Sequence, residues 1–347
     1  MQKRLFIRLS SLGDVILATS VLESVSTSPA ETHWLVKKEF AELLQGHPRI
    51  HRVWAYDKKT GLKGWIRLCD ELAKEGFDDV FDLQSSIRTR LARRIWSGMP
   101  APRWKRVSKE RWKLVGYFIF KDLWPNALRP MAWIQRHGKL VTGGITPAAP
   151  DLRHLISAPG SELPSHSLLP VAAQSQGYYC VMPSSLWPAK AWPESSYLEL
   201  IKKMPSGLHP VILGTASDEA SRQLVQDLAS ARIPHTSGVG VWNLKQVARA
   251  LAGARFYVGN DTGLSHLAES VGARAFVLFG PTTPEMGFGP SRDSSEAIGA
   301  ELWCRPCGKD GRYCFRPVNR YLCMKNLSPE AVRDRIGDAL GEGPRHG

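Results

Sequence analysis

Residues 258–268, VGNDTGLSHLA, have the composition of a turn that binds a diphosphate. The apolar residues before the turn predict a strand that ends at Gly259, and the following pattern predicts a helix that begins near Thr262. The first N–H groups of a helix have no partner within it, and the helix dipole places partial positive charge behind them. Anions are therefore favoured at the amides of Thr262, Gly263 and Leu264, and Gly263 lets a phosphate approach closely.

The same part of the chain adds side chains suited to this task. Thr262 and Ser265 carry hydroxyls, and His266 lies one turn into the predicted helix. The next predicted strand ends in a second polar turn, Phe279–Thr282. The structural alternative is that Asp261 caps the helix and that His266 packs in the core. Because this pattern is much richer than an isolated Gly-x-Gly, we interpret it as a diphosphate cradle.

A lysine that could neutralise a phosphate lies in residues 183–194, PSSLWPAKAWPE. A predicted strand ends just before this loop, and Lys190 comes shortly before a helix start at Trp192–Pro193. An ammonium group at this place can act as a point charge on a phosphate. The alternative is a solvent-exposed loop lysine without a ligand.

A carboxylate that could move a proton lies in residues 10–14, SSLGD. The apolar run Leu5–Leu9 predicts a strand, and a helix is predicted from Asp14 onward. Gly13 permits a tight turn between them, which places Asp14 at the mouth of the strand. Asp14 is therefore a candidate general base that faces a cleft. The alternative is that Asp14 is the N-cap of the helix.

The net charge of +14 comes almost entirely from the first half of the chain. Residues 1–150 contain 26 basic and 14 acidic side chains, and tryptophans interleave with Arg and Lys in residues 88–96 and 102–113. Such a surface attracts polyanions, which include nucleic acids, anionic lipid headgroups and phosphorylated glycolipids. The charge alone does not choose among these anions, and a solvated helix face is the structural alternative.

Alternating strands and helices must position these residues. The predicted strands cover residues 5–9, 32–36, 52–56 and 80–83 in the first half, and 178–182, 210–214, 256–259 and 275–279 in the second. Helical patterns lie between successive strands, which is typical of βαβ units and parallel sheets. We therefore predict an α/β fold with two Rossmann-like domains whose sheets face a central cleft. Ligands of such sheets bind at the carboxyl ends of the strands.

The domain limits follow from a change in composition. Residues 146–176 shift to Pro, Ala, Ser and His and predict a linker, with a short strand over Leu152–Ile156. The predicted domains are residues 1–160 and 161–327. Residues 328–347 form a C-terminal helix and tail, and we expect this helix to pack back across the cleft.

Composition excludes several classes of protein. With 43% apolar and 22% charged residues, the chain is an ordinary globular protein. No run approaches the roughly 20 apolar residues that span a bilayer. The basic, apolar start resembles a secretory signal, but Arg8 and the polar residues 10–14 interrupt it. We therefore expect a cytoplasmic protein whose six cysteines are reduced.

Four cysteines lie close together near the C-terminus, at positions Cys304, Cys307, Cys314 and Cys323. The first spacing is typical of a structural zinc site, whereas the later spacings are irregular. The alternatives are reduced thiols, buried or half-exposed, and disulfides. Cys69 and Cys180 are expected to be core residues.

Together, SSLGD, the K-x-W-P loop and NDTGLSHLA with LFGPT resemble the ADP-heptose:lipopolysaccharide heptosyltransferases, glycosyltransferase family 9. The motifs follow the family's order over roughly residues 3–335. The resemblance implies the GT-B fold, with the acceptor in the N-terminal half and the nucleotide sugar in the C-terminal half. It also implies that catalysis needs no cofactor, and the chain contains no Asp-x-Asp that would suggest a metal on the diphosphate.

The resemblance also implies roles for individual residues. Asp14 matches the family's base, and Lys190 its phosphate-contacting lysine. The donor site would comprise Ser184, Ser185, Asp218, Glu219, Trp242, Asp261, Thr262, Gly263, Leu264 and His266. Among these, Trp242 would lie near adenine, and Asp218 or Glu219 would hold the ribose. Ser184 and Ser185 stand where the family commonly has a Gly-Ala pair. Ser11, Gly13, Arg88 and Arg90 are the candidate acceptor contacts.

The expected reaction is a single displacement, with inversion, that moves a heptose from ADP-heptose to an inner-core acceptor, either Kdo or heptose. One base opposite a stabilised diphosphate provides the necessary groups. The basic first half would bind the acidic acceptor. We expect peripheral contact with the cytoplasmic face of the inner membrane, and we expect no nucleic acid partner. One alternative is another sugar or acceptor on the same fold. The other is a basic nucleic-acid-binding protein with a four-cysteine zinc site.

Overall fold

The computed structural model describes residues 2–25, 30–96, 101–157, 169, 176–308 and 311–341. The chain forms two compact units. The first comprises Met1–Arg111 and Met131–Ala158, and the second comprises Trp112–Pro130 and Pro159–Gly347. Residues Trp112–Pro130, which the sequence analysis assigned to the first domain, thus group with the second unit.

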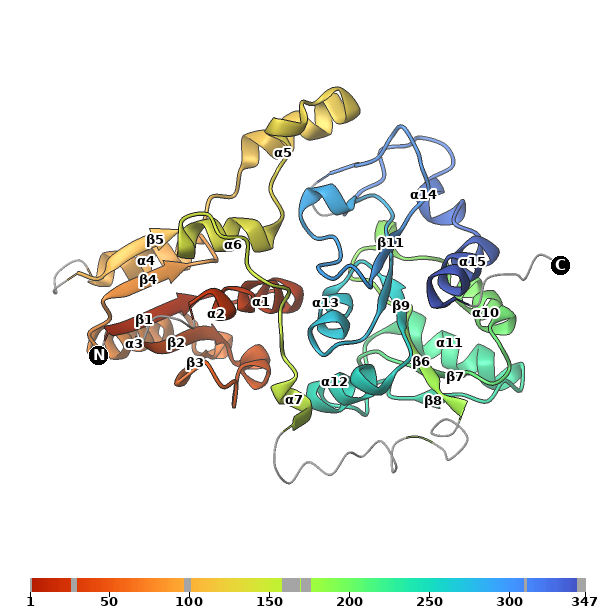
Figure 1. The fold of residues 1–347 in the computed structure, drawn as a ribbon, viewed down its shortest axis with the longest axis horizontal. Coiled ribbons are helices and arrows are strands. Elements are labelled where there is room, and N and C mark those ends of the chain that lie inside the picture. The colour runs from red at the N-terminus through yellow and green to blue at the C-terminus, as the bar shows by residue number, and fades with distance from the viewer. Residues whose placement is uncertain are drawn as a thin grey trace. The chain divides into compact units, whose positions relative to one another are not determined.

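The first unit contains a five-stranded parallel sheet in the order β3-β2-β1-β4-β5 (Figure 1). Its strands are β1 (Gln2–Ile7), β2 (Ala30–Lys37), β3 (Arg52–Tyr56), β4 (Asp79–Asp82) and β5 (Arg103–Arg106). Its helices are α1 (Leu12–Thr19), α2 (Val21–Ser24), α3 (Gly61–Ala73), α4 (Ile87–Ile95), α6 (Trp133–Thr142) and α7 (His154–Ser157), with 3₁₀ turns η1 (Lys38–Leu43) and η2 (Lys58–Thr60). The central strands are apolar on both faces because helices cover both sides of a parallel sheet.

The second unit contains a six-stranded parallel sheet in the order β11-β10-β9-β6-β7-β8 (Figure 1). Its strands are β6 (Tyr178–Met182), β7 (His209–Ile212), β8 (Thr236–Ser237), β9 (Tyr257–Asn260), β10 (Ala275–Leu278) and β11 (Glu296–Ile298). Its helices are α5 (Arg111–Phe120), α10 (Glu194–Lys203), α11 (Glu219–Ser230), α12 (Leu244–Gly253), α13 (Gly263–Ser270), α14 (Leu322–Lys325) and α15 (Pro329–Leu340). The 3₁₀ turns are η4 (Lys121–Leu123), η5 (Asn126–Leu128), η6 (Pro188–Lys190) and η7 (Pro284–Met286). Two α/β units, each with a parallel sheet, confirm the predicted fold class.

The C-terminal helix α15 belongs to the core of the second unit. Val332 and Ile336 are fully buried in the cluster that also holds residues of β6, β9 and α10. An ion pair of 2.8 Å joins Lys203 of α10 to Glu330 of α15. The proposed crossing of this helix over the cleft stays a prediction.

The order of the strands determines where ligands can bind. In the first sheet β1 lies between β2 and β4, and in the second sheet β6 lies between β7 and β9. The chain therefore winds in opposite directions on the two sides of β1 and of β6. Loops diverge at such a reversal and leave a crevice at the carboxyl ends of the strands. Asp14 follows β1, the loop with Lys190 follows β6, and Asp261 follows β9.

Two details of the sequence-based prediction differ from the structure. The strand predicted over Leu152–Ile156 is wrong, because Leu155 N–H donates to the Leu152 carbonyl and the short helix α7 forms instead. The edge strand β5, sequence RWKR, was not predicted. Its arginines pair with buried acids of β4: Arg103 with Asp79 at 2.8 Å and Arg106 with Asp82 at 3.1 Å. Most of the predicted linker lies outside the described residues.

In the part of the chain that the structure describes, no helix has both the length and the apolar character needed to cross a bilayer.

Candidate active site

The carboxylate of Asp14 is held from two sides in the first turn of α1. Ser11, the N-cap, donates to Oδ2 through its backbone N–H at 3.0 Å and its hydroxyl at 2.7 Å. The Arg8 guanidinium pairs with Oδ1 at 2.5 Å. Asp14 is therefore the third residue of a capping box rather than the N-cap. Its side chain stays 20% exposed, and a carboxylate has capacity for about four hydrogen bonds, so a substrate hydroxyl can still bind.

Arg8 is the buried cation that orients Asp14. Its side chain is only 5% exposed, it donates to the carbonyl of Leu83, and its guanidinium carbon lies 5.4 Å from the centroid of the Trp133 ring. Burial lowers the pKa of Arg8, and the negative charges of Asp14 and Asp82 oppose that shift. A buried ion pair resists loss of either partner, because the remaining charge would be uncompensated. Sequence reasoning missed this role, although an arginine within the apolar run of β1 was a visible signal.

A basic pocket lies in the same unit. A cavity of about 340 Å³ is lined by Arg106, Ser108, Glu110, Arg136 and Lys139, among others. Arg136 is almost fully buried, pairs with Glu110 at 3.2 Å, and has an Nη2 without a hydrogen-bond partner among the described residues. Arg106 also pairs with Asp82 of β4 at 3.1 Å, so three cations against two carboxylates leave the pocket positive, which suits a carboxylate or phosphate ligand.

The pocket is close to the Asp14 site, since Trp133 contacts both. The Arg136 guanidinium carbon lies 4.6 Å from the Trp133 ring centroid, and the Arg8 guanidinium packs against the same ring. Lys109 is a further cation here. Burial lowers the pKa of Lys109, and the charges of Arg111 and Arg8 lower it further. This cluster was not predicted from the sequence, because its members come from β5, α6 and the segments between them.

The arginines that were predicted for the acceptor lie at the start of α4, and Gln84, shortly before this helix, accepts the N–H groups of Leu9 and Ser10 in the loop that leads to Asp14. Arg88 and Arg90 are exposed on α4, the helix that follows β4. Of the two other predicted acceptor residues, Ser11 is exposed beside Asp14, whereas Gly13 is buried in α1.

Acid should destabilise the first unit through His137. This side chain of α6 is buried, and burial together with the charges of Arg8 and Arg136 lowers its pKa to about 3. In the unfolded chain a histidine binds a proton near pH 6.5, so between pH 6.5 and 3 the unfolded state holds more protons. The free energy of unfolding should therefore fall as the pH falls through this range.

Urea titrations between pH 7 and 4 measure this dependence. In His137→Gln the slope of the unfolding free energy against pH should decrease by the equivalent of about one proton. His235→Gln is the control, since this half-buried histidine lies in the second unit. Identical slopes for wild type and His137→Gln would mean that His137 is protonated in the folded protein.

Asn260 joins two loops of the second unit at the ends of β6 and β9. It is fully buried, its amide donates to the Pro183 carbonyl at 2.6 Å, and its Oδ1 accepts the Trp192 N–H at 3.0 Å. The register of the sheet sets Met182 opposite Gly259, so the two loops begin side by side. The asparagine of the NDTGLSH motif thus fixes the backbone of the lysine loop. Sequence reasoning had assigned it no role.

Asp261 is the meeting point of three predicted motifs. Its Oδ2 pairs with Lys190 Nζ at 2.5 Å and accepts the Thr282 hydroxyl at 2.8 Å. The stem of Lys190 passes Gly311, where an added Cβ would be 2.9 Å from the lysine Cε. The structure therefore brings the ammonium, the NDTG turn and the Phe279–Thr282 turn together. It does so without placing the ammonium in solvent, because the Lys190 side chain is mostly buried.

Helix α13 begins at this cluster. Thr262 is its N-cap, and Gly263 and Leu264 supply the first helical N–H groups, which have no partner four residues earlier in the helix. These three residues are half-buried. The Ser265 hydroxyl donates to the Thr262 carbonyl at 2.7 Å and so closes the turn. His266 is buried, with Nδ1 3.9 Å from Glu269 Oε2.

The serine pair after β6 divides between core and loop. Ser184 is buried, and its hydroxyl lies 2.9 Å from that of Ser221, which donates to the Leu213 carbonyl at 2.9 Å. Ser185 is half-buried, and its hydroxyl accepts the Trp187 N–H at 3.4 Å. The Ser184 side chain is therefore occupied by the core of α11 and β7.

Trp242 and Asp218 lie on adjoining loops at the ends of β8 and β7. A Cβ added to Gly238 would be 2.4 Å from the Trp242 ring, so the indole covers the turn after β8. The Gly240 N–H donates to the Gly214 carbonyl at 3.0 Å and joins the two loops. Asp218 Oδ2 accepts the Thr215 N–H at 2.6 Å. An aromatic ring and a carboxylate thus lie at one sheet edge.

Glu219, the other candidate for the ribose, is the first residue of α11. It is exposed and pairs with Arg222 on its own helix. Asp218, by contrast, accepts a hydrogen bond within the loop that joins the Trp242 loop through Gly214.

Arg305 braces the Phe279–Thr282 turn. Its guanidinium donates to four backbone carbonyls, those of Phe279, Gly280, Thr282 and Ala300. The neighbouring Cys307 N–H donates to the Pro281 carbonyl at 2.8 Å. The cysteine-bearing segment therefore supports the second polar turn, a function that its sequence did not indicate.

The predicted zinc site is not supported by the structure. Within the described residues, no group of three or more His, Cys, Asp or Glu side chains is arranged to hold a metal ion. All six cysteines are free thiols. Burial, with neighbouring thiols, raises the pKa of Cys307 to about 11. The alternative of a zinc-dependent nucleic-acid-binding protein loses its main support with this site.

Two Rossmann-like units, a carboxylate after the first strand and a braced diphosphate-type turn define a nucleotide-sugar glycosyltransferase of the GT-B class. Comparison with known proteins agrees. Residues 65–314 match the model of glycosyltransferase family 9 (heptosyltransferase), and the chain belongs to this family. It is therefore an enzyme, a glycosyltransferase.

Relatives extend the match over nearly the whole chain. Lipopolysaccharide heptosyltransferase 1 of Pseudomonas aeruginosa is 27% identical over 364 residues, which cover 96% of each protein. Among solved structures, ADP-heptose lps heptosyltransferase II of E. coli aligns with a TM-score of 0.76 and 18% identity, covering 98% of this chain and 99% of that one. E. coli heptosyltransferase WaaC with ADP aligns at 0.69 and 21% identity, covering 97% and 100%. The structural matches establish the shared fold.

Proposed function

We propose that the chain transfers a heptose from ADP-heptose to an acidic lipopolysaccharide inner-core acceptor, with inversion at the anomeric carbon. The name of the 27% identical relative supports the class of reaction. The observation that carries the assignment of residues is the junction at Asp261, where Lys190, the start of α13 and the Phe279–Thr282 turn converge.

The donor diphosphate binds at this junction. The amides of Gly263 and Leu264 and the ammonium of Lys190 accept the negative charge that develops on the leaving ADP. Lys190 is held ready by Asp261, and it exchanges this partner for a phosphate oxygen when the donor binds. The adenosine extends toward Trp242 and Asp218, which supply an aromatic ring and a hydrogen-bond acceptor for ribose hydroxyls.

The acceptor binds to the first unit, with Asp14 as the general base. Its carboxylate removes the proton from the acceptor hydroxyl as the oxygen attacks the anomeric carbon and the bond to the ADP phosphate breaks. Arg8 is a positioning residue, because its ion pair with Asp14 Oδ1 fixes the orientation of the carboxylate. No metal has a part in this scheme, and the reaction takes place at the cytoplasmic face of the inner membrane.

The basic pocket beside Trp133 is the site for an acidic group of the acceptor. Arg106, Arg136 and Lys139 line it, and the free Nη2 of Arg136 provides an unused donor. Kdo carries a carboxylate, whereas an unmodified heptose carries none. The pocket therefore favours an acceptor that ends in Kdo.

A donor and acceptor panel tests the proposed function. ADP-heptose, ADP-glucose and UDP-glucose are offered to acceptors ending in Kdo or in heptose, and the product is identified by mass and its anomeric configuration by NMR. The expected product carries one added heptose on Kdo, with inverted configuration. Transfer from a UDP-sugar, or none from ADP-heptose, would contradict the proposal.

The acceptor pocket leads to a separate prediction. Arg136→Gln/Lys139→Gln should raise the KM for a Kdo acceptor by about 150-fold or more, since two charge-assisted hydrogen bonds are lost and each contributes about 1.5–3 kcal/mol. The Kd for ADP should stay unchanged because the donor binds to the other unit. Steady-state kinetics and ADP titration measure the two effects.

Two further variants sharpen this test. Arg88→Gln/Arg90→Gln examines the arginines predicted from the sequence, and Arg93→Gln, on the same helix, is a matched control. A larger rise in KM for Arg88→Gln/Arg90→Gln than for the pocket variant would place the acceptor at α4 instead.

A further inference from the structure

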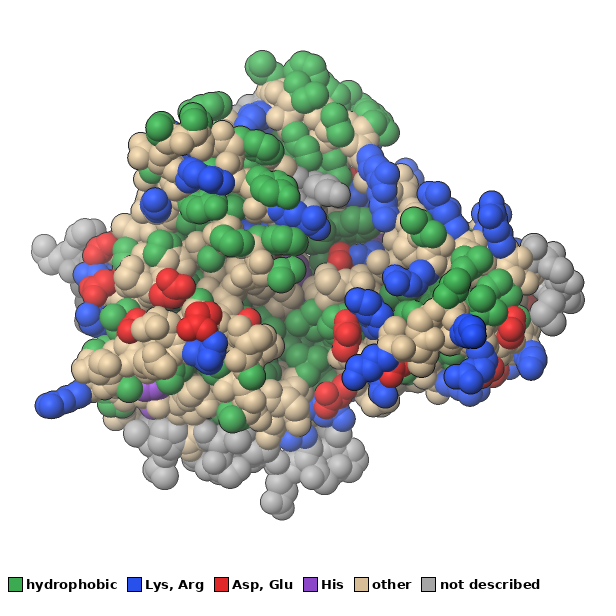
Figure 2. Space-filling view, turned by 180° about the vertical axis from the view of Figure 1, so that it is seen from behind, with side chains coloured by type: hydrophobic (Ala, Val, Ile, Leu, Met, Phe, Trp, Pro, Cys, Tyr) green, Lys and Arg blue, Asp and Glu red, His purple; other side chains and the backbone are tan. Residues whose placement is uncertain are grey.

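Helix α5 and the turn η4 direct apolar side chains to solvent. Four exposed apolar residues follow one another at spacings of three, four and four: Trp112, Val115, Ile119 and Leu123. Trp112, Val115 and Ile119 lie on one side of α5, with Tyr117 buried on the other side, and Gly116 is covered by the Trp124 ring. Leu123 follows in η4, after the positive φ of Lys121 has ended the helix. The polarity of an ordinary surface helix is thus reversed. Hydrophobic side chains gather over α5 in the space-filling view (Figure 2).

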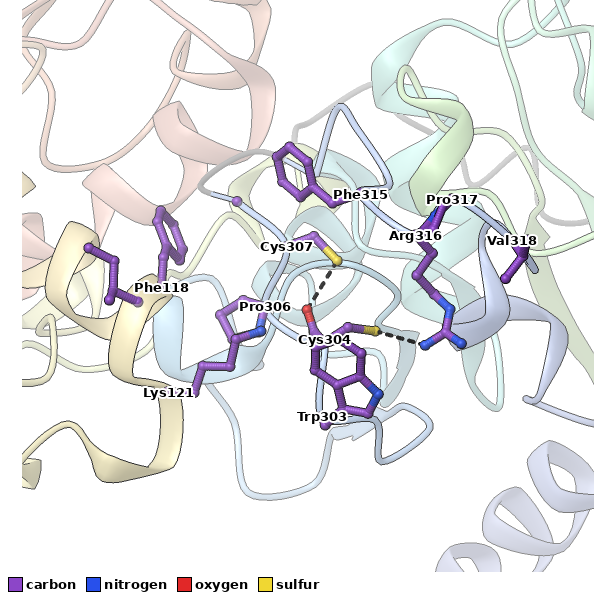
Figure 3. A pocket seen from close by; sticks show the side chains of 12 residues that line it. Phe118, Lys121, Trp303, Cys304, Pro306, Cys307, Phe315, Arg316, Pro317 and Val318 are labelled. Carbon is purple, nitrogen blue, oxygen red and sulfur yellow. Dashed lines mark hydrogen bonds between the residues drawn. The ribbon is translucent and has the colours of Figure 1, made fainter.

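A second set of exposed apolar side chains lies in the cysteine-bearing segment: Trp303, Phe315 and Val318. Together with α5 and η4, this segment surrounds a cavity of about 570 Å³ (Figure 3). The close-up shows Phe118 and Lys121 on the side of the helix and Phe315 on a loop of the other segment. The Lys121 ammonium lies 6.0 Å from the Trp303 ring centroid. We call these seven exposed residues, Trp112, Val115, Ile119, Leu123, Trp303, Phe315 and Val318, the apolar surface.

The same two stretches of chain are strongly basic. Residues 111–121 contain three basic side chains and no acidic one, and residues 303–325 contain six basic side chains and one acidic. Lys121 and Arg316 line the cavity itself. A partner must therefore be apolar where it meets the rings and negatively charged around them. Aromatic residues with flanking Lys and Arg have this preference at a membrane interface.

We propose that the apolar surface docks the enzyme on an anionic lipid bilayer, with its rings between the headgroups and its cations on their phosphates. The proposal rests on the proposed function in one respect, that the acceptor is anchored in this bilayer. Single-stranded nucleic acid is bound chiefly through aromatic rings and cations, so it would leave the aliphatic Val115, Ile119 and Leu123 largely without a partner. A second copy of the chain would bring two positive surfaces together, which costs free energy. Membrane lipid satisfies both the aliphatic and the cationic groups.

Vesicle sedimentation tests the docking directly. The wild-type enzyme should bind vesicles of phosphatidylcholine and phosphatidylglycerol at a 7:3 ratio much more tightly than vesicles of phosphatidylcholine alone. Trp112→Ser/Ile119→Ser/Leu123→Ser should weaken binding at least about tenfold, because three exposed apolar side chains no longer insert. Lys113→Glu/Lys121→Glu should weaken it about fivefold or more per charge. Thermal unfolding of each variant should match that of the wild type, since all these side chains are on the surface.

Matched controls lie in the first unit. Leu62→Ser/Ile87→Ser/Ile145→Ser removes three equally exposed apolar side chains, and Lys58→Glu/Lys59→Glu reverses two exposed charges. Both should bind vesicles as the wild type does. The proposal would be overturned if Trp112→Ser/Ile119→Ser/Leu123→Ser, the α5 variant, bound anionic vesicles as tightly as the wild type. It would also be overturned if the wild type showed no preference for anionic vesicles. A shift of the α5 variant to a smaller species in size-exclusion chromatography would assign the surface to self-association instead.

Quenching of tryptophan fluorescence by brominated phosphatidylcholine tests insertion of the rings while the enzyme remains bound to the vesicle. In vesicles with 30% phosphatidylglycerol, bromine atoms in the acyl chains should quench the wild-type emission. The quenching should fall strongly in Trp112→Phe/Trp303→Phe, because Trp34, Trp65 and Trp192 are buried in the two cores. Unchanged quenching in this variant would place the inserted tryptophan elsewhere.

Activity separates this inference from the proposed function. With a soluble, deacylated acceptor, the α5 variant should turn over as the wild type does, and with a vesicle-embedded acceptor it should be at least about tenfold slower. Failure of the wild type to use the soluble acceptor would count against the proposed function alone. Equal rates of variant and wild type on vesicles would count against the docking surface alone.

Discussion

Asp14→Asn is expected to lower kcat for heptosyl transfer by about 10²- to 10⁴-fold, the usual contribution of a general base. The amide cannot take the proton of the acceptor hydroxyl, whereas the donor site in the other unit is untouched. The Kd for ADP should therefore stay within about twofold of the wild-type value. Single-turnover rates with a soluble acceptor and calorimetric titration of ADP measure the two quantities. Near-normal turnover would remove Asp14 from the chemistry.

A structural effect must be separated from this loss. Asp14 also accepts two hydrogen bonds from the N-cap Ser11 and pairs with buried Arg8, so its replacement costs stability as well. Ser86→Ala is the matched control, because Ser86 begins the comparable capping box of α4 in the same unit. A lost cap costs about 1 kcal/mol. If Ser86→Ala lowers turnover as much as Asp14→Asn does, the effect is structural and the assignment fails.

Lys190→Met is expected to lower kcat/KM by about 10- to 150-fold, which corresponds to the 1.5–3 kcal/mol of a charge-assisted hydrogen bond. Methionine keeps most of the apolar stem that passes Gly311 but removes the charge beside the diphosphate. The Kd for ADP should rise as well, in contrast to Asp14→Asn. This difference distinguishes a phosphate-binding lysine from a base that acts only on the acceptor.

The buried partner of Lys190 provides a second readout. In Lys190→Met, Asp261 keeps only the Thr282 hydroxyl and becomes an uncompensated buried charge, so the second unit should unfold at lower urea. Lys190→Met/Asp261→Asn should recover stability without recovering transfer. Lys202→Met, an exposed lysine paired on α10, is the control and should change neither quantity. Recovery of transfer in the double variant would show that Lys190 acts only by neutralising Asp261.

Local sequence patterns were sufficient for most of the fold. Strands β3 and β6 have the predicted bounds, and helix α15 lies within the predicted residues 328–347, because each is a short apolar or amphipathic pattern between polar turns. Strand β5 was missed because RWKR has no apolar face. It pairs with β4 along the backbone, and ion pairs with Asp79 and Asp82 hold its arginines there; these partners lie far away along the chain. The same reason explains α5, whose assignment to the second unit depends on tertiary contacts.

The candidate site divides in the same way. Asp14, Lys190 and Asp261 could be predicted because each lies in a motif directly after a strand. Their partners could not. Arg8 and Arg305 act through ion pairs and carbonyl contacts with residues far along the chain, and Arg136 gains its role only when α6 lies beside Trp133 and Arg8.

The brace formed by Arg305 determines when a growing chain can complete the Phe279–Thr282 turn. The Phe279–Thr282 turn is made first, and the guanidinium that holds its carbonyls emerges from the ribosome later. During synthesis the pocket is therefore incomplete even after every motif residue has been added. A nonsense mutation just before codon 305 would yield a polypeptide that retains all three motifs but lacks both Arg305 and helix α15, whose Val332 and Ile336 are buried in the core of the second unit, so the intact motifs alone would not mark a gene as active.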